Sequence, residues 1–267
     1  MEKEIKRLFF GLEIHAPWPA HLPAGRLLEE EHRHLTLAFL GNVPYLPLNE
    51  ALKYFPKVSL KIGMAGYFDS CLSLPPRHPN VIAWHARWFQ EDPPIVNFQK
   101  ILCDWLMTLG YSLDKRPWNP HATLCRQPFD AHQWMKDFMP LPFYVSSIHL
   151  YESMGQLHYL PIWSYPLKAP FEEINHTADM AFIIRGENLQ QIYQNAFTAL
   201  AFKVPEFIRF FKPIKFLNDL DDIVIALNDN ITQVDCSVGC PLKAVSFHGK
   251  IIPLEENLLQ WEMIVDV

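Results

Sequence analysis

Two histidine–threonine pairs are the residues of this sequence whose types and spacing could do chemistry. His34 and Thr36 lie in the stretch HRHLTLAFLG, and His121 and Thr123 lie in NPHATLCRQ, where a leucine again follows the threonine. Side chains alternate across a β-strand, so in each stretch the histidine and the threonine share one face of the strand. Imidazole can accept or donate a proton near neutral pH, and a hydroxyl group can hold a phosphoryl oxygen.

A pocket that brings the two pairs together could cleave a phosphate ester without a metal ion. One imidazole would take a proton from water, the other would protonate the departing alkoxide, and the hydroxyl groups would hold the phosphoryl oxygens. Such a site needs one histidine neutral and the other charged, which predicts a bell-shaped dependence of the rate on pH. The alternative is that each histidine is simply satisfied within its own sheet, but the repetition of the motif favours the catalytic interpretation.

The elements that must position these residues alternate between strands and helices. Apolar and polar patterns predict strands and extended runs over residues 7–14, 32–40, 57–68 and 121–125, and a hairpin over 146–167. A helix is expected over 92–109, with Asp92 as its N-cap, Pro93 at its first position and Gly110 at its end. The two motif strands lie about half a domain apart, so we expect two related lobes whose motifs face each other across a cleft.

Length and composition indicate two domains. The chain has 267 residues and a net charge of −6, and all of the excess acidity lies after residue 166. Most of the tryptophans, prolines and histidines lie before that point, so we place the domains at 1–167 and 168–267, with the link between Pro166 and Pro170. Neither part of the chain has the stripe of basic residues that a surface needs to bind a nucleic-acid duplex. A small phosphate substrate, or a phosphate substrate that is recognised at its end, is compatible with this net charge.

Cysteine usage and hydropathy indicate a cytoplasmic protein. The five cysteines are scattered and odd in number, which favours free thiols in a reducing compartment. The string CSVGC has no second cysteine or histidine pair nearby that would complete a metal site. No apolar run is long enough to span a membrane, and the first residues do not have the pattern of a signal peptide, so we expect no association with a membrane.

Residues 7 to about 166 resemble the 2H phosphoesterase family, in its LigT-like RNA 2′,3′-cyclic phosphodiesterase branch. The strings that carry the resemblance are RLFFGLEI, HRHLTLAFLGNV, RPWNPHATLCR and LYESMGQLHYLPIWSYPL, in this order. The resemblance implies an α+β fold of two similar lobes, with antiparallel sheets and helices outside. It also implies that no cofactor is required. One departure is a short, proline-rich interval before the first motif, where the family usually has an amphipathic helix, so one wall of the cleft is expected to be reduced.

The same resemblance implies a role for each site residue. His34 matches the proton donor to the leaving group, and His121 matches the base that activates water. Thr36 and Thr123 match the hydroxyls that hold the phosphate, and Arg126 matches a basic residue near it. The alternative for Arg126 is a solvated strand end.

Residues 168–267 resemble archease, a small α+β protein that acts as a cofactor of tRNA-splicing RNA ligases. The strings HTAD, LKAVSFHGKII and WEMIVDV carry the resemblance, and a helical stripe over 189–200 follows a strand that ends at Arg185. The resemblance implies a divalent cation, Ca²⁺ or Mg²⁺, held by Asp179, Asp266 and Val267. The alternative is a capping Asp179 and a frayed C-terminus. The middle of the archease fold is shortened here, which puts the surface for a ligase partner in question.

These resemblances predict an RNA 2′,3′-cyclic phosphodiesterase that acts on RNA ends or cyclic nucleotides and yields 2′-phosphomonoesters. The archease-like part would link this activity to tRNA splicing and RNA ligation. One alternative is a non-catalytic module that binds RNA ends or an RNA ligase. Another is a metal-dependent phosphatase that uses Asp179 and Asp266, whose activity a chelator would abolish.

Overall fold

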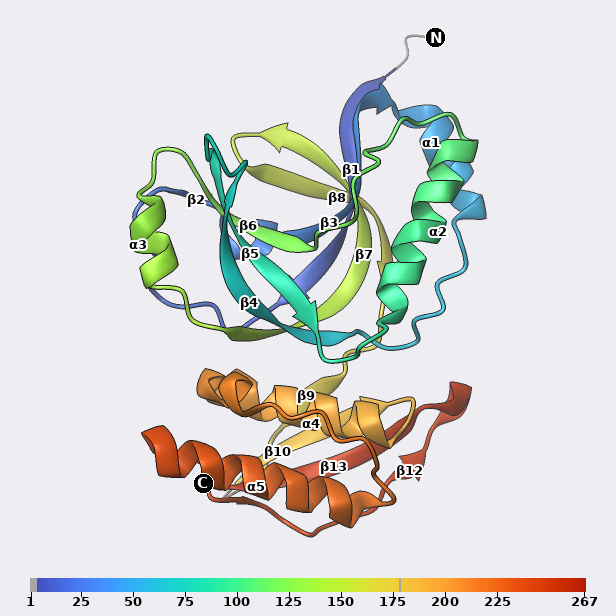
Figure 1. Cartoon of the computed structure of the whole chain (residues 1–267). Helices are drawn as coiled ribbons and strands as arrows, with labels where there is room; N and C mark the ends of the chain where they lie inside the picture. Colours follow the sequence, from blue (N-terminus) through green and yellow to red (C-terminus); the bar gives the residue numbers. More distant parts are fainter. Residues whose placement is uncertain (1–3, 178) are drawn as a thin grey trace.

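The strands of the first 166 residues form one antiparallel sheet of eight strands. The structure is a computed structural model that describes residues 4–177 and 179–267 (Figure 1). The strands are β1 (Ile5–His15), β2 (Arg26–Leu27), β3 (His34–Pro44), β4 (Ala65–Leu74), β5 (Val81–Trp88), β6 (His121–Arg126), β7 (Leu141–Gly155) and β8 (His158–Pro166). The strands predicted over 7–14 and 121–125 and the predicted hairpin, β7 with β8, are therefore present. The strand predicted over 32–40 begins at His34, and of the extended run predicted over 57–68 only the residues from Ala65 onward belong to a named strand.

This sheet consists of two halves that close into a ring. One half has the order β3-β1-β7-β8, and the other has the order β4-β5-β6-β2. The halves are joined by β4 with β7 and by β3 with β6, where the paired residues are Leu35 and Ala122. Because β1 pairs with both β3 and β7, six strands form a closed circuit. The two halves agree with the expectation of two related lobes.

Helices cover the outside of the ring. The helices are α1 (Tyr45–Ala51), α2 (Pro94–Thr108) and α3 (Ala131–Lys136), and Figure 1 shows α1 and α2 on one side and α3 on the other. Alternate residues of β1, Leu8, Phe10 and Leu12, are buried in the same core as the apolar face of α2. The residues between them, such as Gly11 and Glu13, face the inside of the ring.

The start of α2 differs from the prediction. The helix begins at Pro94, and Pro93 occupies the N-cap position with an extended backbone, so the assignment of Asp92 as N-cap is wrong. The reason is that a proline disfavours the helical conformation of the residue before it, so Pro94 keeps Pro93 out of the helix. The end is as expected, with Gly110 at a φ of 89° just beyond the last turn.

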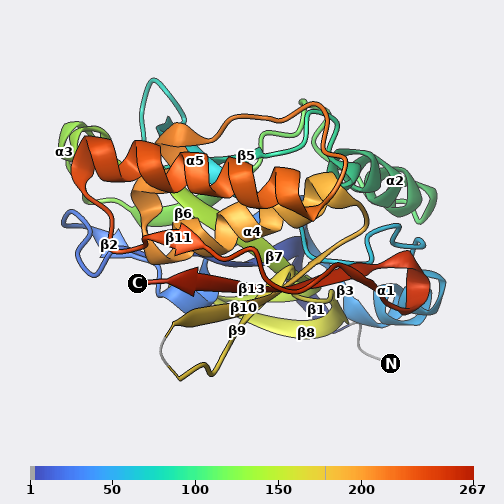
Figure 2. The same ribbon diagram turned by 90° about the horizontal axis from the view of Figure 1, so that it is seen from below.

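The last hundred residues form a second, five-stranded antiparallel sheet with two helices on one face. Figure 2 shows helices α4 (Leu189–Lys203) and α5 (Leu220–Val238) side by side over this sheet. The strands are β9 (Phe171–Ile174), β10 (Met180–Gly186), β11 (Ala244–Val245), β12 (Ile252–Pro253) and β13 (Leu259–Asp266). The whole is an α+β fold with antiparallel sheets. Across the described residues, no helix is long and apolar enough to cross a membrane.

Phe89 joins the two parts of the chain. It follows β5 of the first sheet, yet it is only 6% exposed and belongs to the core of the second part. Its ring centroid lies 4.4 Å from that of Phe211 and 5.8 Å from that of Phe197. The two parts therefore share apolar packing.

Replacing Phe89 by alanine is expected to lower the free energy of unfolding by about 3–5 kcal/mol, because a buried phenyl ring is lost and a cavity is left. Urea unfolding followed by tryptophan fluorescence measures this change. The control is Tyr54→Ala, where the side chain is 79% exposed and a change of less than about 0.5 kcal/mol is expected. A loss of less than about 1 kcal/mol in Phe89→Ala would mean that the contact between the parts contributes little to stability.

Candidate active site

The two histidine–threonine motifs lie side by side on neighbouring strands. Leu35 of β3 is paired with Ala122 of β6, and both are fully buried in the core outside the ring. The residues that flank this pair therefore face the inside of the ring, with His34 opposite Thr123 and Thr36 opposite His121. The prediction that the motifs face each other across a cleft is wrong in this respect, because β3 and β6 pair directly where the two halves of the sheet meet.

Both histidines are fixed in the same way. The Nδ1 of His34 lies 2.8 Å from the carbonyl oxygen of His32, and the Nδ1 of His121 lies 2.7 Å from the carbonyl oxygen of Asn119. A carbonyl oxygen only accepts, so Nδ1 carries the proton in both rings and Nε2 is the nitrogen that can exchange a proton with a ligand. The two motifs thus repeat a local geometry as well as a sequence.

His34 lies among aromatic rings. Its ring centroid is 4.7 Å from that of Phe9, 5.3 Å from that of Tyr151 and 4.9 Å from that of Tyr159. Gly11 makes room for this packing, since a Cβ atom there would lie 3.4 Å from His34 Cδ2 and 3.3 Å from Tyr151 Cε2. Burial lowers the pKa of His34 to about 4, and this effect outweighs the hydrogen bond to the His32 carbonyl, which raises it.

His121 is less enclosed than His34. Burial lowers its pKa below the ordinary value of 6.5, the hydrogen bond to the Asn119 carbonyl raises it, and the positive charge of His85 lowers it. A positive charge on His121 also lowers the pKa of His34. The two imidazoles are therefore close enough to interact electrostatically.

A β-bulge brings Arg126 to the same face as Thr123. Along β6, Thr123 pairs with Ala83 and Cys125 pairs with Ile82, so Leu124 is an extra residue in the ladder. Leu124 and Cys125 are both fully buried in the core, and the next residue, Arg126, returns to the inside of the ring. Strict alternation would have placed Arg126 on the opposite face.

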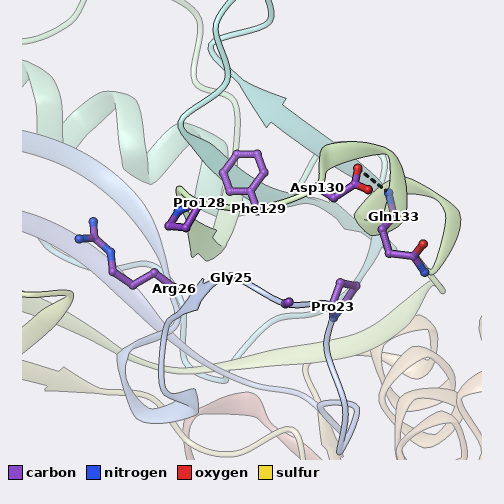
Figure 3. A pocket seen from close by; sticks show the side chains of 8 residues that line it. Pro23, Gly25, Arg26, Pro128, Phe129, Asp130 and Gln133 are labelled. Atoms are coloured by element: carbon purple, nitrogen blue, oxygen red, sulfur yellow. Dashed lines mark hydrogen bonds between the residues drawn. The ribbon is translucent and has the colours of Figure 1, made fainter.

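A second arginine lies next to Arg126. Arg26 of β2 is paired directly with Arg126, and within the described part of the chain no carboxylate forms an ion pair with either guanidinium. Arg26 lines a cavity of about 810 Å³ together with Pro23, Pro128 and Phe129. Figure 3 shows these side chains. Like charges that lie opposite each other across a strand pair are unfavourable, so this position favours an anion.

Three groups near the motifs were not predicted. Oε2 of Glu13 lies 3.3 Å from His149 Nε2 and accepts a hydrogen bond from Ser146. His149 first, and then Ser146, lower the pKa of Glu13 to about 2. His85 and Asp69 form another pair, with Oδ1 of Asp69 2.7 Å from Nδ1 of His85. Tyr151 is the third group and packs against His34. They lie on strands that are far apart in the sequence, so no local pattern could have grouped them.

A cavity of about 1240 Å³ opens beside His85. Arg87, Lys100, Arg116 and Trp118 line it, and it reaches Phe211 and Pro213 of the second part of the chain. The indole nitrogen of Trp118 donates a hydrogen bond to the carbonyl oxygen of Thr36, at 2.8 Å. The segment that carries Trp118 therefore borders the first motif.

The predicted metal ligands lie at one end of the second sheet. Met180 is paired with Val265, so Asp179 and Asp266 flank this pair at neighbouring strand ends. Lys243 Nζ donates to the carbonyl oxygen of Val267, and Ser246 donates to Asp266. No group of three histidine, cysteine, aspartate or glutamate residues that could hold a metal ion is found among residues 4–177 and 179–267. A cation at Asp179, Asp266 and Val267 stays a prediction.

Comparisons with known proteins relate part of the chain to one enzyme. No protein-family model matches the chain. A segment of 111 residues is 32% identical to RNA 2′,3′-cyclic phosphodiesterase from Geobacillus stearothermophilus. This segment covers 40% of this chain and 33% of that protein. The matched segment is homologous to that phosphodiesterase. The chain thus matches about a third of the length of this relative.

Solved structures similar to the chain include two of LigT from E. coli. The complex with 3′-AMP has a TM-score of 0.46 and 22% sequence identity, and it covers 61% of this chain and 99% of that chain. The apo form has a TM-score of 0.45 and 24% identity, and it covers 62% of this chain and 99% of that chain.

Proposed function

We propose that residues 1–167 form an RNA 2′,3′-cyclic phosphodiesterase that hydrolyses terminal 2′,3′-cyclic phosphates to 2′-phosphomonoesters. The observation that carries this proposal is the pairing of β3 with β6, which puts two imidazoles with Nδ1 bonded to carbonyls and two threonine hydroxyls on one face. The homology of part of the chain to an RNA 2′,3′-cyclic phosphodiesterase supports the choice of substrate.

The proposed reaction assigns one proton transfer to each histidine. Nε2 of His121 takes a proton from water as the water oxygen attacks phosphorus. The bond between phosphorus and O3′ breaks, and Nε2–H of His34 gives its proton to the departing oxygen. The product has a 2′-phosphate and a free 3′-hydroxyl, and solvent returns the proton from His121 to His34. Thr36, Thr123 and Arg126 hold the phosphoryl oxygens.

The test of this proposal is an assay of a 2′,3′-cyclic nucleotide and of an oligonucleotide with a 2′,3′-cyclic end, each with and without EDTA. We expect turnover to the 2′-phosphomonoester and the same rate with the chelator, since no step uses a metal ion. Tight binding without turnover would favour a non-catalytic module that binds RNA ends. Loss of activity with EDTA would favour a metal-dependent phosphatase that uses Asp179 and Asp266.

Replacing Arg126 by alanine is expected to lower kcat/KM for the cyclic substrate by about 10- to 100-fold, because a hydrogen bond to a charged group contributes about 1.5–3 kcal/mol. Steady-state kinetics at fixed salt measures this loss. The matched control is Arg77→Ala in the turn between β4 and β5, where the side chain is exposed and no effect is expected. Equal kinetics for the two variants would mean that Arg126 is a solvated strand end.

We infer that residues 168–267 form an archease-like domain with an RNA ligase as its partner. The strings HTAD and WEMIVDV support this inference, and the shared packing at Phe89 ties the domain to the phosphodiesterase part. Size-exclusion chromatography of the full chain with a tRNA-splicing RNA ligase tests it, because a complex should elute before either protein. Separate elution would contradict a ligase partner.

A further inference from the structure

An aspartate–histidine pair lies beside His121 on the next strand. His85 of β5 is paired directly with His121 of β6, whereas His34 lies on β3, on the other side of β6. Nδ1 of His85 is 2.7 Å from Oδ1 of Asp69 on β4. Side chains that are directly opposite in an antiparallel pair have Cβ atoms about 4.5–5.5 Å apart. Three histidines therefore face the inside of the ring from three neighbouring strands.

A β-bulge turns Asp69 toward His85. Phe68 pairs with Ala86 and Ser70 pairs with His85, so Asp69 is an extra residue in β4. The hydroxyl of Ser70 donates to the same oxygen of Asp69, at 2.9 Å. The side chain of His85 is 30% exposed and that of Asp69 is 24% exposed, so water screens the pair only partly. The carboxylate is thus held at the imidazole by its position in the ladder.

We propose that His85, held by Asp69, keeps His121 unprotonated on the acid side of neutrality and so acts as a positioning residue for the general base. The inference rests on the proposed function, in which His121 is that base. Two imidazolium groups opposite each other would repel, so a positive charge on His85 disfavours one on His121. Asp69 places a carboxylate at the imidazole of His85, whereas Nδ1 of His121 bonds a neutral carbonyl, so a positive charge has an anionic partner at His85 and none at His121 among these contacts.

Other charged or titratable groups line the cavity beside His85 or lie on the neighbouring strands. In the cavity beside His85 they are Tyr67, Arg87, Glu91, Asp92, Lys100, Cys103, Asp114 and Arg116. On the neighbouring strands they are His34 of β3 and Arg126 of β6. Asp114 is already engaged by Arg116, at 2.8 Å from its Nε. Asp69 is the carboxylate within hydrogen-bonding distance of His85 in the described residues.

The experiment is an NMR titration of His121 in the full chain, with its imidazole signal assigned from its loss in His121→Gln. In His85→Gln and in Asp69→Asn, the midpoint of His121 is expected to rise by about 0.5–1 pH unit, because a neighbouring positive charge is lost. In His85→Lys, which keeps a positive charge, the midpoint is expected to stay at or below that of the native protein. The control is Asp114→Asn, which removes a different carboxylate and should leave the midpoint of His121 unchanged.

The rate gives a second readout. In His85→Gln, kcat/KM is expected to fall about 3- to 10-fold at pH 5, where more of His121 is protonated, and to be unchanged at pH 8, where His121 is neutral in both proteins. A purely structural role of His85 would lower the rate equally at both pH values.

The inference is wrong if the titration midpoint of His121 stays at its native value in both His85→Gln and Asp69→Asn. It is also wrong if the rate of His85→Gln falls equally across the pH range. Absence of turnover in the native protein would instead contradict the proposed function. The titration midpoints would then still decide whether His85 controls the protonation of His121.

Discussion

Replacing His121 by alanine is expected to lower kcat for a 2′,3′-cyclic nucleotide by about 10²- to 10⁴-fold, and replacing His34 by glutamine is expected to have an effect of the same size. Each histidine transfers one proton in the proposed reaction, and a positioned acid or base contributes a factor of this order. Because the two act in one step, the double variant is expected to be about as slow as the worse single variant. Single-turnover kinetics with a cyclic mononucleotide measures these rates.

The two substitutions are chosen to leave the fold intact. His121 is partly exposed, so alanine leaves no closed cavity, whereas glutamine at position 34 keeps volume among the three aromatic rings. The matched control is His132→Ala on α3, an exposed histidine for which native kinetics is expected. If His121→Ala or His34→Gln turns over at the native rate while circular dichroism shows a native fold, the assignment of that histidine is refuted.

Local patterns in the sequence predict much of this fold. The alternation in β1 and in the motif strands, the apolar stripe of α2 and the hairpin of β7 with β8 are all visible in short windows. The same alternation predicts that His34 and Thr36 share a face, because this depends only on the strand period. The alternation does not predict which strands become neighbours. The sequence therefore predicts that the two motifs face each other across a cleft, whereas in the structure their strands pair directly.

The remaining site residues depend on bulges and on distant pairings. Leu124 and Asp69 are each an extra residue in the pairing of their strand. The bulge at Leu124 changes the face on which Arg126 lies, and the bulge in β4 turns Asp69 itself toward His85. Single-sequence patterns assume strict alternation, which would have put Arg126 in the core. His85 lies on β5 and Asp69 lies at a bulge in β4. The position of that bulge leaves no signal in the amino-acid composition of either strand.

The pH dependence of kcat/KM is expected to have its maximum on the acid side of neutrality. The active free protein needs His34 protonated and His121 neutral. The pKa of His34 is lowered to about 4 and that of His121 is lowered from 6.5, both first by burial. The profile therefore rises up to about pH 4, has its maximum between the two pKa values, and falls about tenfold per pH unit above that of His121. A maximum of kcat/KM above pH 7 would contradict this assignment of protons.

The acid limb of this pH profile should shift when Tyr159, whose ring packs against His34, is replaced by a smaller residue. Tyr159 stands edge-on to the imidazole, with its centroid at 4.9 Å, so Tyr159→Ala admits water and weakens the desolvation that lowers the pKa of His34. We expect the acid limb to shift toward higher pH, whereas Tyr165→Ala, on the same strand but packed against Phe55, should not move it. If both variants keep the native acid limb, burial by Tyr159 does not control the proton on His34, and the low pKa must come from Phe9 and Tyr151, which pack against the ring from β1 and β7.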